Sequence, residues 1–402
     1  MTARCLLVCH TFPPLIGGSA GVYEALARHA GGAVAVLTSR LDPATGRDRP
    51  GWREHDAAVA YPLRRIGLVR PPLPGGAVRN PLLRHAIWAA RALRLAAAVA
   101  AMARHHRADA VCLCDDETVG WLVPFVRHVL RRRVLIYCHG DDLVQPDPAA
   151  RQRRRRRFDQ ADLVIAAGSF PGRQLIDLYG VAPEHVAVLP NGVDLDRFRP
   201  RPPDPVRRAA LGLDGRRVIL APTRLVPRKG VDRLIEAMPA IRAGCPEALL
   251  LVAGDGPQRP ALEALAMATG SASDVLFLGA VPTQEMSTLY SITELVALPN
   301  RFEPGESDGT PLVFLEANAC GRPVIGGRAG GTAEAVEDGR NGLLVDGKDP
   351  AAIAASVLRV LQDQALAGRL ATGALAAART AGWPARTAAF LALCAASPRK
   401  GG

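Results

Sequence analysis

One segment of the chain, residues 308–316, combines the start of a helix with acidic residues. Thr310 is a suitable N-cap, and Pro311 suits the first helical position, where a missing N–H costs nothing. The free amides of Leu312 and Val313 would then lie at the positive end of the helix dipole. Such a helix start forms an anion site suited to phosphate.

Two carboxylates flank this expected phosphate site. Asp308, followed by Gly309, comes just before it and would repel a phosphate unless it points elsewhere, for example at sugar hydroxyls. Glu316 lies one turn after Leu312 on the same helix face, so it can reach a ribose or a sugar. On local features alone, a capped helix with a solvated acid explains the segment equally well.

A second charged group follows the strand expected over residues 217–223. Arg224 and Lys229 lie five residues apart before a helix, where they could straddle a diphosphate and neutralise a leaving group without a metal. Lys229 is one of only three lysines among 50 basic residues. The alternative interpretation is a solvated basic turn.

Glycine and histidine residues follow two strands expected in the N-terminal half. Gly17 and Gly18 come after the first strand, where glycine lets the backbone approach a phosphate or sugar closely. This loop matches neither the dinucleotide-binding nor the P-loop pattern, which argues against nicotinamide binding and P-loop chemistry. A plain turn explains the two glycines equally well. His139 follows the strand expected near residues 133–137 and would face a cleft, although a structural role is the simpler interpretation of a single histidine.

Three other charged groups give weaker signals. Asp194 and Asp196 resemble a metal-binding D-x-D pair, but they lie in a Pro/Gly-rich connection, so we expect no metal there. Residues 115–117 are expected to cap the helix that follows them. Six arginines within residues 151–157 are expected on a helix, as a solvated face or as a patch for anionic lipid or an anionic acceptor. With one adjacent aromatic residue and no recognition fold, nucleic-acid binding is not expected.

The elements that position these residues alternate along the chain. Short Val/Ile/Leu-rich runs separated by helical segments predict parallel sheets covered on both faces. A Pro- and Arg-rich segment, residues 197–208, interrupts this alternation and is expected to be a linker. The sequence therefore predicts an α/β protein with two Rossmann-like, doubly wound domains facing a cleft, over residues 1–197 and 198–382. A last helix, about 383–402, is expected to pack back onto the first domain.

Composition limits the class of protein. A chain of 402 residues with 49% hydrophobic and 22% charged residues predicts a large core in two or three domains. Eight scattered cysteines without a C-x-x-C pair argue against a disulfide framework and fit a reducing cytoplasm. No apolar run approaches 18 residues, so no membrane span is expected. The net charge of +12 is uneven, with 27 basic and 18 acidic residues up to position 197 and 23 and 20 after it.

As a set, these motifs resemble glycosyltransferase family 4, retaining sugar-nucleotide transferases with two Rossmann-like domains in the GT-B fold. LPNGVDLDRF at 189–198 resembles the family's interdomain segment. RLVPRKGVDRLIEAM, LLLVAGDGP, VLFLGAVP and LEANACGRPVIGG then follow in the family's order and spacing. The match covers most of the chain and is strongest from 186 to 347, while FPPLIGG and HGDD resemble the N-terminal counterparts.

The resemblance implies roles for the charged residues of the C-terminal half. Arg224 and Lys229 would hold the donor diphosphate, and the amides of Leu312 and Val313 would hold its distal phosphate. Glu316 would bind the ribose. The same donor site would include the three residues just before Pro311, namely Asp308, Gly309 and Thr310.

The resemblance also covers residues outside this segment. Residues near Val281 would bind the base, Gly17 and Gly18 would shape the loop over the phosphates, and His139 would lie near the transferred sugar. The family has two glutamates separated by seven residues, and the first position here is Asp308, one methylene shorter. We expect this departure to bear on sugar preference more than on activity. The catalytic set implied is His139, Asp308, Arg224 and Lys229.

Together, the resemblance implies a metal-independent, cofactor-free hexosyltransferase with an N-terminal acceptor domain and a C-terminal donor domain. It would move a sugar from a nucleotide-diphosphate sugar to a lipid-linked or other glycan or small-molecule acceptor, in polysaccharide or glycolipid synthesis. The expected location is the cytoplasm, with the inner face of the membrane as an alternative. Other functions left open are a sugar-nucleotide epimerase or hydrolase of the same fold, and a non-catalytic basic protein that binds membrane or nucleic acid.

Overall fold

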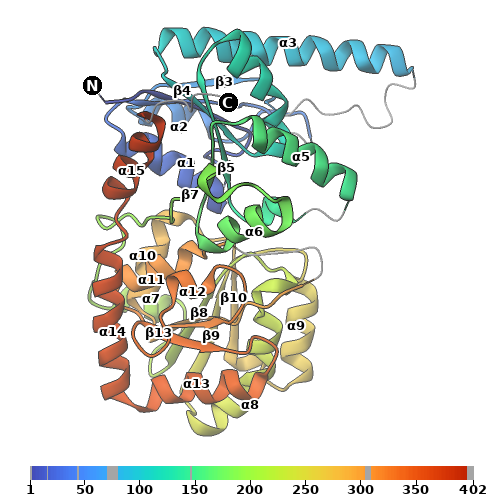
Figure 1. Cartoon of the computed structure of the whole chain (residues 1–402). Helices are drawn as coiled ribbons and strands as arrows, with labels where there is room; N and C mark the ends of the chain where they lie inside the picture. Colours follow the sequence, from blue (N-terminus) through green and yellow to red (C-terminus); the bar gives the residue numbers. More distant parts are fainter. Residues whose placement is uncertain are drawn as a thin grey trace. The chain divides into compact units, whose positions relative to one another are not determined.

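The computed structural model of the chain describes residues 2–15, 17–42, 45–69, 80–144, 147–303 and 309–395. The chain divides into two compact units (Figure 1), Met1–Asn191 with the segment from Trp383, and Gly192–Gly382. The segment 192–197, expected in the first domain, thus belongs to the second unit. Each unit is built on one parallel sheet, as the alternating pattern predicts.

The first sheet has seven strands in the order β3-β2-β1-β4-β5-β6-β7. Its strands are β1 (Cys5–Cys9), β2 (Val34–Ser39), β3 (Leu63–Ile66), β4 (Ala110–Cys114), β5 (Arg133–Cys138), β6 (Leu163–Ala166) and β7 (Val186–Val188). The central strands are buried along their whole length, because helices cover both faces of a parallel sheet. The strand order reverses between β1 and β4, and in such sheets ligands bind beyond the carboxyl ends at this point.

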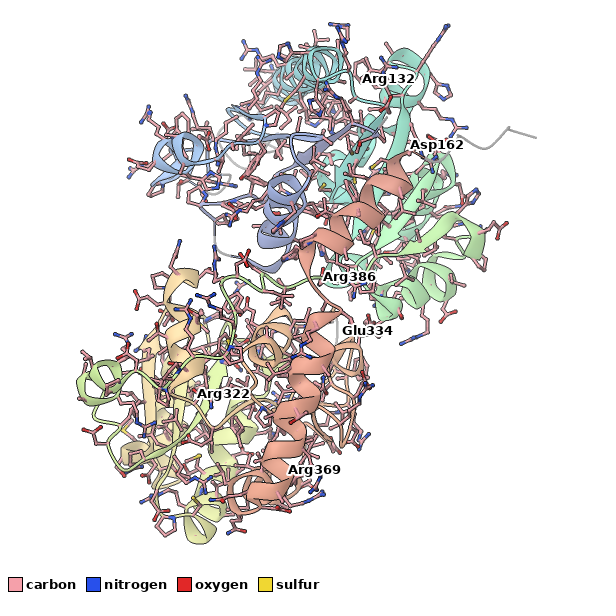
Figure 2. The ribbon with its side chains drawn as sticks, turned by 90° about the vertical axis from the view of Figure 1, so that its left-hand side faces the viewer. Arg132, Asp162, Arg322, Glu334, Arg369 and Arg386 are labelled. Atoms are coloured by element: carbon pink, nitrogen blue, oxygen red, sulfur yellow. The ribbon has the colours of Figure 1, made fainter. Side chains whose placement is uncertain are left out.

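Helices of the first unit follow these strands. They are α1 (Gly18–His29), α2 (Trp52–Ala58), α3 (Pro81–His105), α4 (Asp116–Val119), α5 (Pro148–Gln160) and α6 (Ser169–Tyr179), with the short turns η1 (Gly120–Leu122), η2 (Phe125–Val129), η3 (Asp141–Leu143) and η4 (Pro183–His185). The last helix, α15 (Trp383–Ala395), packs against α1. Figure 2 shows α15 lying across the first unit, with Arg386 near its start.

The second sheet has six strands in the order β10-β9-β8-β11-β12-β13. Its strands are β8 (Arg217–Pro222), β9 (Ala248–Ala253), β10 (Val275–Gly279), β11 (Leu295–Leu298), β12 (Val324–Gly327) and β13 (Gly342–Val345). Its helices are α7 (Pro205–Ala210), α8 (Val231–Gly244), α9 (Arg259–Ala268), α10 (Thr283–Ser291), α11 (Leu312–Ala319), α12 (Thr332–Ala335), α13 (Pro350–Gln362) and α14 (Gln364–Arg379), with the turns η5 (Pro227–Lys229) and η6 (Ala272–Asp274). The strand order here reverses between β8 and β11.

The segment expected to be a linker, residues 197–208, is part of the second unit instead. Phe198 is buried in its core and meets Tyr290 edge-to-face, with ring centroids 5.9 Å apart. Asp204 caps α7 by accepting the backbone N–H of Arg207. The segment therefore contributes a buried aromatic side chain and a short helix to the second unit, and its Pro-rich composition predicts neither.

Helix α3 is the one helix of the described ranges that is long and apolar enough to cross a membrane, by length and composition only. The sequence predicted no membrane span, because no apolar run approaches 18 residues. Arg91 and Arg94 lie within α3. The second half of α3 belongs to the core of the first unit, where Leu95, Val99 and Met102 are buried.

The arginine run forms a helix as predicted, but it is not simply a solvated face. Arg154 is 3% exposed, and its Nε donates to Asp116 Oδ2 at 2.8 Å while Nη1 donates to the hydroxyl of Tyr179. Burial lowers the pKa of the Arg154 guanidinium, but the charge of Asp116 outweighs this and raises it. Asp115 caps α4 as expected, since its carboxylate accepts the backbone N–H of Glu117.

We predict that Asp116→Ala destabilises the first unit by about 3–5 kcal/mol, because it leaves the Arg154 guanidinium buried without its carboxylate. Urea denaturation followed by circular dichroism measures the loss. The matched control is Asp159→Ala, which removes an exposed partner of Arg155 and should cost less than about 1 kcal/mol. Equal losses in the two variants would contradict the structural role of the buried pair.

Candidate functional site

The carboxyl ends of β8 and β11 lie side by side at the point where the second sheet reverses its strand order. The two strands pair in parallel, with Leu295 opposite Ile219 and Val296 opposite Leu220. The residues that directly follow them, 223–230 and 299–303, therefore leave the sheet at the same edge. This is where an open α/β sheet binds its ligand.

The loop after β8 carries the two cations that the sequence singled out. Arg224 is exposed, and Lys229 is half-buried at the end of the turn η5. Gly230 follows with φ of 71°, and a Cβ there would collide with the carbonyl oxygen of Pro299. Glycine is needed at this position because the backbone of the first loop touches the backbone of the second.

The loop after β11 ends in the helix start that was expected to bind phosphate. Helix α11 begins at Leu312, with Pro311 in the N-cap position, so the expected Thr310 cap is wrong by one residue. The Thr310 hydroxyl instead donates to Glu334 Oε2 at 3.2 Å. Leu312 and Val313 remain in the first turn, where the amides have no acceptor within the helix and no side chain caps them.

A third loop, after β12, packs against this helix start. A Cβ at Gly331 would lie 2.7 Å from the amide nitrogen of Thr310 and 2.8 Å from the carbonyl carbon of Gly309. Glycine therefore permits backbone contact here as well. Asp308, the acidic residue expected before the phosphate site, lies outside the described residues.

Glu316 lies one turn into α11 and is half-buried. Burial raises the pKa of its carboxyl to about 7, although the Tyr290 hydroxyl and the charge of Arg197 act in the opposite direction. The hydroxyl of Tyr290, on α10, donates to Glu316 Oε2 at 2.8 Å. Sequence reasoning missed Tyr290, because its only signal is an aromatic residue on the inner face of a helix.

Not every predicted donor residue lies at the same strand ends. Val281 follows β10, which is separated from β8 by β9, so its loop lies further along the same edge of the sheet. Its side chain is half-buried against the core. The β8–β11 junction thus brings together Arg224, Lys229, Leu312 and Val313, and the Val281 loop borders it.

In the first unit, the structure brings His139 together with the first helix. His139 follows β5, and its Nε2 lies 2.8 Å from the hydroxyl of Tyr23 on α1. Its ring stacks on Tyr137 with centroids 5.0 Å apart. The carboxylate of Asp142 accepts the backbone N–H groups of His139 and Gly140, which fixes the turn.

Gly17 and Gly18 lie at the start of α1, and both are exposed. Gly17 occupies the N-cap position with an extended backbone, and no described atom lies within 4 Å of the place of a Cβ. Local packing therefore does not demand glycine at position 17. An uncovered backbone at a strand's carboxyl end is what close approach of a ligand requires.

A pair that sequence reasoning missed lies at the β1–β4 reversal. His10 Nδ1 is 3.0 Å from Asp115 Oδ2, and both residues follow the carboxyl ends of their strands. Asp115 has φ of 100°, which is rare for a residue other than glycine and strains the backbone. Such strain occurs at functional sites, so this pair joins the candidate residues of the first unit.

The expected absence of a metal site stays a prediction. Asp194, of the D-x-D pair, uses its carboxylate to accept the backbone N–H groups of Asp196 and Arg197, which forms a local turn. In the part of the chain that the structure describes, no group of three or more His, Cys, Asp or Glu side chains is placed to hold a metal ion. All eight cysteines are buried and free.

Two family models match the chain, one on each half. The model described as Glycosyltransferase Family 4 matches residues 16–197, and the model described as Glycosyl transferases group 1 matches residues 205–375. The second match contains both cations and the α11 helix start. The first contains Gly17, Gly18 and His139.

Similar proteins of known activity extend over most of the chain. A GDP-mannose-dependent alpha-(1-6)-phosphatidylinositol monomannoside mannosyltransferase of Mycolicibacterium smegmatis is 33% identical, over 89% of each chain. A D-inositol 3-phosphate glycosyltransferase of Thermobispora bispora is 38% identical, over 68% of this chain and 66% of its own length.

Solved structures share the fold at lower identity. Anabaena Alr3699/HepE in complex with UDP-glucose matches with a TM-score of 0.74 and 22% identity, over 97% of this chain and 98% of its own. Sucrose-phosphate synthase from Thermosynechococcus elongatus matches with a TM-score of 0.76 and 23% identity, over the same shares. The architecture of two doubly wound domains is therefore confirmed.

The raised pKa of Glu316 predicts a pH dependence of stability. Between an unfolded value of 4.5 and a folded value of about 7, the folded chain binds more protons than the unfolded chain. Stability therefore decreases as the pH rises through this window. We expect Glu316→Gln to reduce this decrease, as measured by thermal unfolding between pH 4.5 and 7.5.

The exposed residue Glu337 provides the matched control for this experiment. Glu337→Gln should leave the pH dependence of unfolding as in the wild type, because it removes a carboxyl that is not buried. If Glu316→Gln and the wild type have the same slope against pH, Glu316 is not a proton-binding group in this range.

Proposed function

The chain belongs to glycosyltransferase family 4 and has the GT-B fold, and we propose that it transfers a hexosyl group from a nucleotide-diphosphate sugar to a lipid-linked acceptor with retention. The second unit would bind the donor, and the first unit would bind the acceptor. We further propose that it acts in glycolipid or polysaccharide synthesis, at the cytoplasmic face of a membrane.

The observation that carries the donor assignment is the junction of β8 and β11. Arg224 and Lys229 supply mobile positive charge, and the amides of Leu312 and Val313 supply fixed donors at the start of a helix. A diphosphate carries negative charge along its length, so these two kinds of group suit its two phosphates. Glu316, next along the same helix, would accept hydrogen bonds from ribose hydroxyls.

The activities of the relatives favour particular substrates. The mannosyltransferase depends on GDP-mannose, so we propose a GDP-hexose, with mannose as the first candidate, as the donor. The two named relatives act on acceptors that share an inositol phosphate group. A lipid or small molecule containing inositol phosphate is therefore the acceptor class that we propose.

We propose that the reaction needs no metal or cofactor. The bond between the sugar and the nucleotide diphosphate breaks, and the charge that develops on the leaving oxygen is met by Arg224, Lys229 and the start of α11. The acceptor hydroxyl attacks the same face of the sugar and passes its proton to the departing phosphate oxygen. We propose that His139, which Tyr23 and Tyr137 hold in place, contacts the transferred sugar. We propose the same contact for Asp308.

The donor assignment predicts that Lys229→Ala lowers kcat/KM by at least about 100-fold, because one donor of charge to the leaving group is lost. The exposed Lys348 is the matched control, and Lys348→Ala should transfer sugar at the wild-type rate. Initial rates with GDP-mannose and an inositol phosphate acceptor provide the measurement. A wild-type rate for Lys229→Ala would refute the diphosphate assignment.

Substrate class and metal independence are tested separately. Thermal stabilisation by GDP-mannose should exceed that by UDP-glucose and ADP-glucose, and product analysis should show retention of the anomeric configuration. Full activity is expected in EDTA, because side chains and helix amides provide the positive charge. Strict dependence of transfer on a divalent ion would contradict this mechanism.

A further inference from the structure

The first half of α3 lies on the outside of the first unit and is exposed. Figure 1 shows the helix running along this unit, with one half reaching past the strands of the sheet. Leu82 is 79% exposed and Leu93 is 72% exposed, and Leu83 and Trp88 are also exposed. Large apolar side chains gathered on one helix mark an interaction surface rather than chance exposure.

The exposed residues of α3 form a continuous apolar stripe. Leu82, Ala86, Ala90, Leu93 and Ala97 recur at helical spacing, and all of them are exposed. A surface helix of a globular protein usually has polar residues on this side. Between residues 82 and 97, the outer side of α3 thus carries a line of exposed apolar residues. We name Leu82, Leu83, Ala86, Ala90, Leu93 and Ala97 the α3 stripe.

Arginine accompanies this stripe, and acidic residues do not. Arg91, Arg94 and Arg104 lie on α3 itself and are exposed. Trp88 contacts Trp121 of η1 with ring centroids 5.9 Å apart, and η1 in turn contacts η2 and α5. The segments that form this layer, 81–106, 118–133 and α5 (Pro148–Gln160), contain 14 arginines and one acidic residue, Asp159, which pairs with Arg155.

Part of this charge has a structural use, but much of it faces solvent. Arg154 and Arg157 pair with the buried Asp116. Arg131 and Arg132, after η2, are exposed, and Figure 2 shows Arg132 at the end of the first unit where α3 also lies. Exposed arginines also lie on α5, namely Arg153, Arg155 and Arg156. The layer is therefore a cationic surface with an apolar stripe along one helix.

These two properties together identify the kind of partner. A second copy of the chain would bring an equally cationic surface, which repels this one. A nucleic acid would neutralise the arginines but offers no apolar medium for the leucines. An anionic lipid bilayer provides both, since its headgroups attract arginine and its acyl chains bury leucine, while tryptophan prefers the boundary between them.

We propose that the α3 stripe and the arginines around it seat the enzyme on an anionic membrane surface. The helix would lie flat in the headgroup region with Leu82 and Leu93 toward the acyl chains and Arg91 and Arg94 at the phosphates. This inference extends the proposed function, because a lipid-linked acceptor is held in such a surface. Lipid binding and sugar transfer are measured separately, so one can fail without the other.

The test is flotation of the full chain with vesicles of phosphatidylcholine alone and of phosphatidylcholine mixed with phosphatidylserine. Wild-type protein should bind the anionic vesicles and release at high salt. The double variant Leu82→Glu with Leu93→Glu should lose at least about tenfold in its partition to these vesicles, because two buried apolar contacts are replaced by repelled charges.

The matched control changes an exposed leucine elsewhere in the same unit. Leu178, on α6, is 51% exposed, and Leu178→Glu should bind vesicles like the wild type. Transfer to a water-soluble acceptor should be unchanged in the double variant, which shows that it folds. If the double variant folds, as judged by circular dichroism, but no longer transfers sugar to the water-soluble acceptor, α3 takes part in the reaction and the proposal is overturned.

Three further outcomes would also overturn the proposal. The first is equal vesicle binding by the double variant and the wild type. The second is binding of the wild type to double-stranded DNA but not to anionic vesicles. The third is a change of oligomeric state in the double variant, seen by analytical ultracentrifugation, with vesicle binding unchanged, which would make the stripe an interface between copies.

Discussion

Backbone contact between the loop after β8 and the loop after β11 is the constraint on which the candidate donor site depends. Gly230 allows this contact, because any side chain there would meet the carbonyl of Pro299. Gly331 allows the same kind of contact between the loop after β12 and the start of α11. The cations at 224 and 229 are therefore placed relative to the helix start by main-chain packing. A site assembled in this way is preorganised, which is what stabilisation of a leaving-group charge requires.

The first unit uses arginine in a different way. Arg65 has a buried side chain that donates to both oxygens of Asp56 and to the main-chain carbonyls of Ser39 and Pro13, so it fixes the loop after β1. Arg154 performs a similar task beside Asp116 and also donates to the carbonyl of Asp142, in the turn that carries His139. The excess positive charge of this half is thus divided between internal supports of the strand-end loops and a surface layer. Net charge alone cannot separate these two uses.

Sequence reasoning predicted the sheets and the helix that starts near residue 312, because each has a local signal. It misplaced the N-cap, because Thr310 is engaged by Glu334, a contact across 24 residues that local capping rules do not contain. It described Arg154 as one of a solvated run, because a run of six arginines in seven positions has no periodicity from which a buried member can be recognised. Tyr290 was missed because, as at Thr310, its partner is distant in sequence: Glu316 lies 26 residues away.

The placement of charge follows from what each half is proposed to bind. A diphosphate is compact, so a few groups held at one strand junction can neutralise it at short range. Salt screens this interaction weakly, because Lys229 is half-buried. A membrane surface is extended, and its attraction acts through many exposed arginines across about a Debye length, where salt screens strongly. Ionic strength therefore separates the two functions physically: raising it should detach the enzyme from lipid well before it weakens the binding of a nucleotide sugar. The local cluster of charge in the second unit thus suits a diphosphate, and the dispersed arginines of the first unit suit a membrane surface.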